Sequence, residues 1–386
     1  MRILFATPPG YGLMMPLVPL VWAAQAAGHA ARLATTGRMC RVAADAGLEA
    51  VDVCPGRDLW GQLQAGVGRG AGRGAGSGPP PSPFRMFTEE MTAGTADAAR
   101  ELGADLLVHT SDHGAGQLAA LTLGLPTLDV GNRVSWSTRD RGGPVRDIAG
   151  VEAVRTALGL DDAEPHVLAR VDPRAPSMGG LAADATDPRD GVAWWPMRYV
   201  PFNGGAVVEP WLRVTPDRPR VLVTLGTVVP TVAGTDVVTV LLEALAGLDV
   251  EVVLALGDAT LAQGTALPAN VRAVGYLPLS AALPTCRLVV HHGGSGTTAA
   301  PLHFGVPQLV LPSFADNPLS ARRVSERGVG LEHDPATLDV ATARTLVRRL
   351  LAEPAFARAA AEVAAEMAAQ PSPAAVVGRV ERALAG

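Results

Sequence analysis

The sequence predicts an α/β protein with two domains, each built on a parallel β-sheet covered by helices. Two observations lead to this class. The chain has 386 residues, 48% of them hydrophobic, which suffices for two domains with separate cores. Apolar strands also alternate with helical stretches in both halves, and strands joined through helices in this way pair in parallel.

In the first half, the elements follow one another from the N-terminus. An apolar strand comes first, then a turn rich in Gly and Pro, and then an apolar helical pattern that Gly28 closes. The same rhythm returns about seventy residues later. The expected elements are a strand at 2–6, a helix at 17–27, strands at 31–35 and 105–109, a helix at 116–124 and a strand at 125–129.

The second half starts a new strand at 220–224, with further strands at 250–256 and 288–291 and an alanine-rich helix at 356–367. Before it, residues 201–219 carry several prolines and no long periodic segment, which is typical of a linker. The expected organisation is therefore a first domain at 1–200, a linker at 201–219, a second domain at 220–370 and a final helix at 371–386.

One segment of the first half differs from the rest. Residues 64–83 consist of Gly, Arg and Ala repeats that lead into a run of prolines. Such a composition buries too little apolar surface to offset its ordering entropy, so we expect a mobile loop.

Charge and cysteine content narrow the class of protein. The net charge of −5 argues against nucleic acid or an anionic membrane as a partner. No apolar run reaches the roughly 20 residues of a membrane helix, and the start of the chain does not resemble a signal peptide, so we expect a cytoplasmic protein. Cys40, Cys54 and Cys286 lack the spacing of a metal site and predict no disulfide framework.

The most informative motif is the run His-His-Gly-Gly-Ser-Gly-Thr-Thr at 291–298, between an apolar strand and a helical segment. Glycines let the backbone approach an anion closely, hydroxyls donate hydrogen bonds, and a helix N-terminus adds partial positive charge. A tight strand-to-helix turn would explain the run alone about equally well. A second buried strand at 305–312, followed by Asp316 and Asn317, favours the reading as a phosphate site with a sugar beside it.

These motifs resemble the donor-binding signature of family 1 glycosyltransferases with the GT-B fold. Among these, the chain is most similar to actinomycete enzymes that attach deoxysugars to antibiotic aglycones. The resemblance extends to the start of the chain, to "RYVPFNG" at 198–204, to "VLVTLGT" at 221–227 and to "QPSPAAVV" at 370–377. It implies two Rossmann-like domains that face each other across a cleft, and a final helix that crosses back to the first domain.

The resemblance also implies roles on the donor side. The diphosphate would be bound by His292 and the turn after it, helped by a second loop that follows the strand at 220–224. Tyr276 would stack on the nucleobase and Leu277 would hydrogen-bond it through its backbone, while Asp316 and Asn317 would hold the sugar. The implied donor residues are Gly226, Thr227, Tyr276, Leu277, His292, Gly293, Gly294, Ser295, Gly296, Thr297, Asp316 and Asn317.

We expect no metal or other cofactor. Glycosyl transfer develops negative charge on the departing diphosphate, and backbone amides with an imidazole, such as that of His292, can neutralise this charge. No Asp-x-Asp motif for a divalent ion stands near a donor strand. The co-substrate would be a dTDP-deoxysugar.

The acceptor side carries an anomaly at residue 13. Many relatives that transfer to oxygen have a histidine there that deprotonates the acceptor hydroxyl, whereas this chain has Leu13. Loss of a general base typically costs about 10²–10⁴ in rate. Met14 and Met15 beside it suit either a flat apolar aglycone or plain core packing. Tyr11 and Trp136 complete the expected acceptor contacts.

Three explanations for Leu13 stay open. Another residue can serve as the base, with Asp112 and His113 as first candidates and Asp129 and Asp140 as further ones. The acceptor can be a phenol or an amine, which needs little help. Or the sugar can be transferred to carbon, as in some C-glycosylating relatives that also lack this histidine.

The leading hypothesis is thus an inverting glycosyltransferase that acts on an aromatic polyketide or macrolide aglycone. A nucleotide-sugar epimerase shares the architecture but would need no acceptor site. A catalytically silent helper protein would need no donor signature. Dimers occur among similar enzymes, so a homodimer is also considered.

Overall fold

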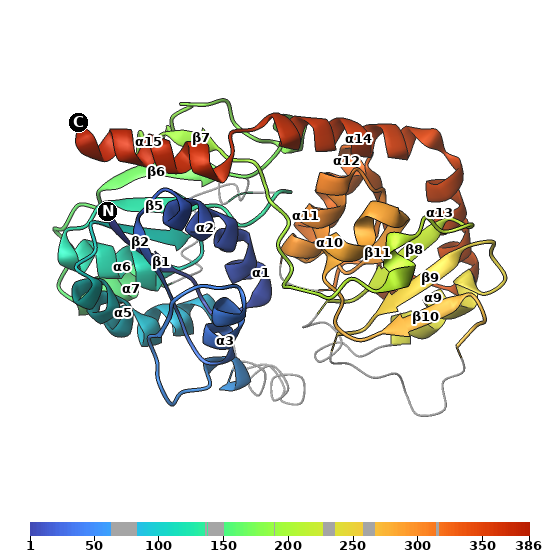
Figure 1. Ribbon diagram of the computed structural model, residues 1–386, viewed down its shortest axis with the longest axis horizontal. Coiled ribbons are helices and arrows are strands. Elements are labelled where there is room, and N and C mark those ends of the chain that lie inside the picture. Colours follow the sequence, from blue (N-terminus) through green and yellow to red (C-terminus); the bar gives the residue numbers. More distant parts are fainter. Residues whose placement is uncertain are drawn as a thin grey trace.

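The computed structural model describes residues 1–62, 83–135, 137, 150–188, 190–226, 236–257, 267–313 and 316–386. Figure 1 shows two lobes side by side, each built on one sheet. The loop expected at 64–83 lies outside these residues except for Pro83, which begins a helix.

The first sheet has seven parallel strands in the order β3-β2-β1-β4-β5-β6-β7. Its strands are β1 (Arg2–Ala6), β2 (Ala30–Thr35), β3 (Ala50–Asp52), β4 (Leu106–Thr110), β5 (Thr127–Val130), β6 (Val167–Asp172) and β7 (Trp194–Pro196). Its helices are α1 (Tyr11–Met14), α2 (Val18–Ala26), α3 (Arg38–Asp45), α5 (Pro83–Leu102), α6 (Gly114–Leu123) and α7 (Val151–Ala157).

The second sheet has six parallel strands in the order β10-β9-β8-β11-β12-β13. Its strands are β8 (Arg220–Thr224), β9 (Glu251–Ala255), β10 (Val271–Val274), β11 (Cys286–His291), β12 (Gln308–Val310) and β13 (Gly330–Glu332). The helices are α9 (Asp236–Leu245), α10 (Leu279–Ala282), α11 (Ser295–Phe304), α12 (Asn317–Glu326), α13 (Val340–Ala352), α14 (Pro354–Ala369) and α15 (Pro373–Ala385).

Most expected elements are present, with shifted ends. The strands at 2–6 and 220–224 are found as predicted, whereas β4 and β5 begin one and two residues late. The first helical stretch is broken up, because Pro16 lies within the short 3₁₀ turn Met15–Leu17 between α1 and α2. After β7, the linker makes the 3₁₀ turn Pro210–Arg213 and buries Leu212 in the second domain.

The final helix crosses back to the first domain, as predicted. α15 packs on α2, and Val376, Val377 and Val380 are buried in the same core as Leu17 and Leu20. Figure 1 shows this helix, in red, lying over the lobe that contains the N-terminus. Apolar packing therefore holds the C-terminal helix, which follows the second domain in the chain, against the first domain.

A further buried cluster joins the two domains directly. Val134, Met178 and Tyr199 from the first domain pack with apolar side chains of α11, α12 and α14, such as Val324. This cluster fixes the segment after β5 against the second domain, which matters for the site below.

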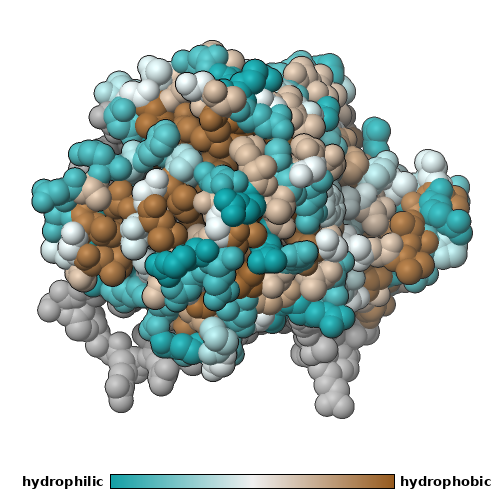
Figure 2. Space-filling view, turned by 60° about the vertical axis from the view of Figure 1, so that its left-hand side comes forward, coloured by the Kyte–Doolittle hydropathy of each residue, from teal (hydrophilic) through white to brown (hydrophobic). Residues whose placement is uncertain are grey.

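At the surface, hydrophobic and hydrophilic residues are intermingled on the face in Figure 2. Within the described ranges, no helix is both long and apolar enough to cross a membrane. Cys40, Cys54 and Cys286 are free thiols. The cytoplasmic location and the homodimer stay predictions.

Candidate active site

A pocket lies where the strand order of the second sheet reverses. The loops after neighbouring strands β8 and β11 run in opposite directions along the sheet, which leaves a crevice at the carboxyl ends of the strands. The pocket lies at these ends and is closed from the other side by α1 and the linker. It is lined by Tyr11, Gly12, Met15, Pro16, Tyr199, Phe202, Asn203, Thr224, Gly226, Ala255, Gly257, Tyr276, Leu277, Leu279, His292, Gly294, Ser295, Gly296, Thr297 and Asn317.

His292 is held between two glycines. A Cβ atom on Gly226 would come within 2.5 Å of the His292 ring, and one on Gly294 would come within 2.4 Å. Gly226 also has a φ of 69°, which side chains rarely adopt. These two positions therefore need glycine so that the imidazole can lie at the pocket wall.

Burial lowers the pKa of His292 to about 4, while the negative charge of Asp316 opposes this shift. The imidazole is thus neutral at pH 7. Its Nδ1 atom is buried and has no hydrogen-bond partner within the described part of the protein. A neutral ring that lacks a partner on one side is suited to bind a polar ligand.

The N-terminus of α11 opens into the same pocket. Ser295, Gly296 and Thr297 form its first turn and line the pocket, and the residue before them, Gly294, makes no side-chain cap. The first amides of a helix lack partners within the helix and carry partial positive charge. This arrangement can bind a phosphate without a broad basic surface.

Two residues that the sequence reasoning did not assign support this turn. The backbone N–H of Gly293 donates to Nδ1 of His291 at 3.0 Å, and Nε2 of His291 pairs with Oε1 of Gln308 at 2.7 Å. The amide of Gln308 then donates to the carbonyl of Thr298 in α11 at 3.3 Å. Because Nδ1 accepts, Nε2 must carry the proton, and burial lowers the pKa of His291 to about 3.

Tyr276 stands opposite the glycine-rich turn, half exposed. Its hydroxyl donates to the carbonyl of Asn203 in the linker at 2.7 Å, and its ring lies 6.1 Å from that of Tyr11 in the first domain. Leu277 lines the pocket beside it. The Tyr276 ring, which is predicted to stack on a base, belongs to the second domain and contacts both the linker and the first domain.

The two residues predicted to hold the sugar lie differently. Asn317 lines the pocket, is buried, and its Nδ2 atom has no hydrogen-bond partner within the described residues. Asp316 is absent from the pocket lining and instead contacts Ser295 at 3.3 Å and Arg133 at 2.8 Å. Thr227, the remaining donor candidate, lies outside the described residues.

The acceptor candidates separate in the same way. Tyr11 and Met15 line the pocket, whereas Met14 is fully buried in the core of the first domain. Leu13 folds towards Gly10 and is not a lining residue. Trp136 lies outside the described residues.

Neither first candidate for the base lines the pocket. Asp112 is buried in an ion pair with Arg133, 2.5 Å between Oδ2 and Nη2. His113 is buried at the start of α6, and burial, together with the neighbouring His109, lowers its pKa to about 3. The two side chains have separate surroundings.

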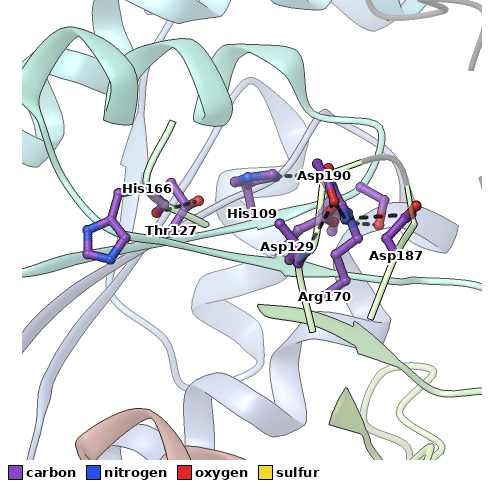
Figure 3. A network of polar contacts seen from close by, with 10 residues as sticks. His109, Thr127, Asp129, His166, Arg170, Asp187 and Asp190 are labelled. Carbon is purple, nitrogen blue, oxygen red and sulfur yellow. Dashed lines mark hydrogen bonds and ion pairs between the residues drawn. The ribbon is translucent and has the colours of Figure 1, made fainter. Parts of the chain in front are cut away.

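Asp129 belongs to a network of polar contacts at the ends of β4, β5 and β6 (Figure 3). Ser111 donates to its Oδ1 at 2.6 Å, and Arg170 lies 3.7 Å from its Oδ2. Arg170 also pairs with Asp187 and Asp190. Asp129 is thus engaged with neighbouring side chains, and Asp140 lies outside the described residues.

Comparisons with known proteins agree with this geometry. Residues 78–226 and 239–383 match the N-terminal and C-terminal domains of the family described as erythromycin biosynthesis protein CIII-like. The elloramycin glycosyltransferase ElmGT of Streptomyces olivaceus is 37% identical, over 99% of this chain and 97% of the relative. The chain is a family 1 glycosyltransferase of the natural-product type.

Solved structures extend this likeness to the whole GT-B fold. The glycosyltransferase SnogD of Streptomyces nogalater superposes with a TM-score of 0.80 at 34% identity, over 100% of this chain and 99% of the other. SsfS6 of Streptomyces sp. SF2575, solved with thymidine diphosphate, gives 0.78 at 30% identity, over 99% of both chains. Because the chain is a glycosyltransferase of this family, the epimerase and helper hypotheses are set aside.

Within the described ranges, no three His, Cys, Asp or Glu side chains form a group that could hold a metal ion. The expected independence of metal stays a prediction.

Proposed function

We propose that this glycosyltransferase moves a deoxysugar from a dTDP donor to a carbon atom of a natural-product aglycone, with inversion at the anomeric carbon. The observation that carries the donor half is the neutral, partly unpartnered His292 beside the open N-terminus of α11. A diphosphate there would gain backbone amides, hydroxyls and an imidazole at once.

The chemistry needs little from a base on the acceptor side. An electron-rich ring carbon attacks the anomeric carbon, the bond from that carbon to the diphosphate oxygen breaks, and TDP leaves with the electron pair towards α11. A single displacement of this kind inverts the configuration. The ring then regains aromaticity by losing its proton to water.

Three positions favour carbon as the attacking atom. Leu13 cannot accept a proton, and neither Asp112 nor His113 lines the pocket. The pocket residues from the first domain are Tyr11, Gly12, Met15, Pro16 and Tyr199, which offer apolar and aromatic surface to a flat aglycone. We therefore place the aromatic polyketides ahead of the macrolides as acceptors.

The test is a product analysis. The purified enzyme is incubated with dTDP-L-rhamnose and a set of hydroxylated anthraquinone and macrolide aglycones, with and without EDTA, and products are detected by mass spectrometry. We expect a product that survives acid hydrolysis, with inverted anomeric configuration by NMR, and equal yield with chelator. An acid-labile product would identify transfer to oxygen or nitrogen and overturn the carbon assignment.

The variant Leu13→His tests the bypass of the usual base. If the native reaction does not use a base at this position, turnover of the native acceptor does not rise, while slow transfer to oxygen of a small phenol becomes detectable. A strong gain in the native reaction would show that Leu13 is a degraded base position.

A further inference from the structure

Arg133 joins the acceptor-side domain to the predicted sugar-binding carboxylate of the other domain. It follows β5 and is buried, with 7% of its side chain exposed. Its Nη2 lies 2.5 Å from Asp112, in the turn after β4, and its Nε lies 2.8 Å from Asp316, at the N-terminus of α12. A planar guanidinium can serve two carboxylates in fixed directions at the same time.

The two ends of this bridge differ in their surroundings. The Asp112 side chain has no exposed surface, whereas that of Asp316 is 17% exposed and also accepts a hydrogen bond from Ser295 in the pocket wall. Asp112 therefore anchors the guanidinium, and the guanidinium in turn sets the position of Asp316. The Nη1 atom of Arg133 donates to Asn132 at 2.7 Å, which restrains the side chain further.

The backbone that carries Arg133 is itself fixed to the second domain. Val134 packs in the interdomain cluster with Val324 of α12, and Ser135 hydrogen-bonds Ser320 of the same helix at 2.8 Å. Arg133 thus reaches Asp316 from a docked segment rather than from a free loop.

We propose that Arg133 is a positioning residue for the donor sugar: it holds the Asp316 carboxylate at the place where the sugar binds. This inference rests on the proposed function, because it assigns Asp316 to the sugar. Its consequence is that the donor site is complete only when the segment after β5 is docked on the second domain. The nucleotide part of the site, at His292 and α11, meets Asp316 through the hydrogen bond from Ser295, so we expect Arg133 to affect it less than it affects the sugar.

The closing experiment compares the affinities for TDP and for dTDP-L-rhamnose by calorimetry. The ratio of the two affinities measures how much the sugar contributes to donor binding, and this measurement does not require catalytic turnover. Arg133→Lys keeps the positive charge but cannot span both carboxylates. We expect the sugar's contribution to fall by about tenfold or more, since a preorganised charged contact is lost, while the affinity for TDP changes less than about twofold.

Two further variants separate positioning from a merely structural role. Asp316→Asn alone should lose the same contribution, and the double variant should be no worse than either single one, because both remove one interaction. Ser135→Ala removes the neighbouring interdomain hydrogen bond without touching Asp316, so it should leave the ratio unchanged even if the melting temperature falls.

Several outcomes would overturn the proposal. An unchanged ratio in Arg133→Lys, additive losses in the double variant, or an equal loss in Ser135→Ala would each reject Arg133 as a positioning residue. If the wild-type protein binds TDP and dTDP-L-rhamnose equally, the proposed sugar site fails and this inference fails with it. If the wild-type protein binds dTDP-L-rhamnose more tightly than TDP and Arg133→Lys keeps this difference, the sugar site stands and only the role of Arg133 is rejected.

Discussion

The carboxyl ends of the two sheets resemble each other in topology and differ in whether their unpartnered polar groups line the pocket. On the second sheet, His292 and Asn317 each keep a buried nitrogen without a partner in the described protein, and α11 starts without a side-chain cap. On the first sheet, Asp112 and Asp129 lie in ion pairs with arginines. His113 and Asn132 also keep buried nitrogens without a partner in the described protein, but neither residue lines the pocket.

This difference separates two kinds of ligand recognition. Buried polar groups are stable only with partners, so the unpartnered groups of the second sheet, which line the pocket, gain when a polar ligand arrives there. The unpartnered groups of the first sheet lie outside this pocket, and the contribution of the first domain to the pocket is apolar and aromatic. The donor is expected to be selected by polar contacts and the acceptor by shape.

The largest effect is expected at His292. His292→Ala should lower turnover by about 10²–10³-fold, the range seen when one preorganised donor to a developing anion is removed. Steady-state kinetics with a saturating donor measures it. The matched control is His166→Ala, an exposed histidine just before β6. Equal rates in the wild type and His292→Ala would mean that the polar character of the donor side is unrelated to catalysis.

The second prediction concerns stability in acid. Burial lowers the pKa values of His113 and His291 to about 3 and that of His292 to about 4. The unfolded chain protonates these groups below its ordinary pKa of about 6.5, whereas the folded protein does not. Stability is therefore full above pH 6.5 and falls towards pH 4, by up to about 1.4 kcal/mol per pH unit for each histidine.

Urea unfolding at pH 7.5 and 5.5 measures this slope. His113→Gln should reduce the change of unfolding free energy with pH by the contribution of one histidine, on the acceptor side. Added TDP should reduce the contribution of His292, because an adjacent diphosphate raises the pKa of that imidazole. A pH-independent stability would show that these rings are accessible to protons in the folded protein.

A smaller effect is expected from Gly294→Ala. The added methyl group would meet the His292 ring at 2.4 Å, while the backbone of Gly294 is in an ordinary extended conformation. We expect the affinity for TDP to fall by about tenfold, a loss of roughly 1.4 kcal/mol. In the background of His292→Ala the same substitution should be nearly neutral, because its clash has gone. Equal losses in both backgrounds would place the effect elsewhere in the turn.

The smallest effect is expected from Asp112→Asn on the acceptor side. The amide oxygen can still accept from Arg133, so turnover should change by less than about tenfold, well short of the 10²–10⁴ lost with a general base. Asp129→Asn serves as the comparison. A fall of 10² or more in Asp112→Asn, with unchanged affinity for TDP, would identify Asp112 as the base and remove the contrast drawn between the two sheets.

Local patterns in the sequence were enough for much of the architecture. Short apolar runs before Gly-rich or Pro-rich turns predict the strands at 2–6 and 220–224, and an alanine-rich composition predicts the helix at 356–367, which is α14. Apolar periodicity did not give the helix ends, since prolines at 16 and 19 divide the first helical stretch. The long helix α5 was not predicted, and it begins at Pro83, the last residue of the proline-rich run at 79–83.

The sequence by itself determined the two α/β domains and pointed to the glycine-rich turn, because both depend on residues that are neighbours in the chain. Only the tertiary structure decided which polar groups already have partners. The contact of Arg133 with Asp316 spans 183 positions, and that of His291 with Gln308 joins two separate strands. No local pattern records such pairs, since their distance depends on how strands and domains pack. For the same reason, Met14 and Met15 look alike in sequence and differ in the structure: one is buried in the core and the other lines the pocket.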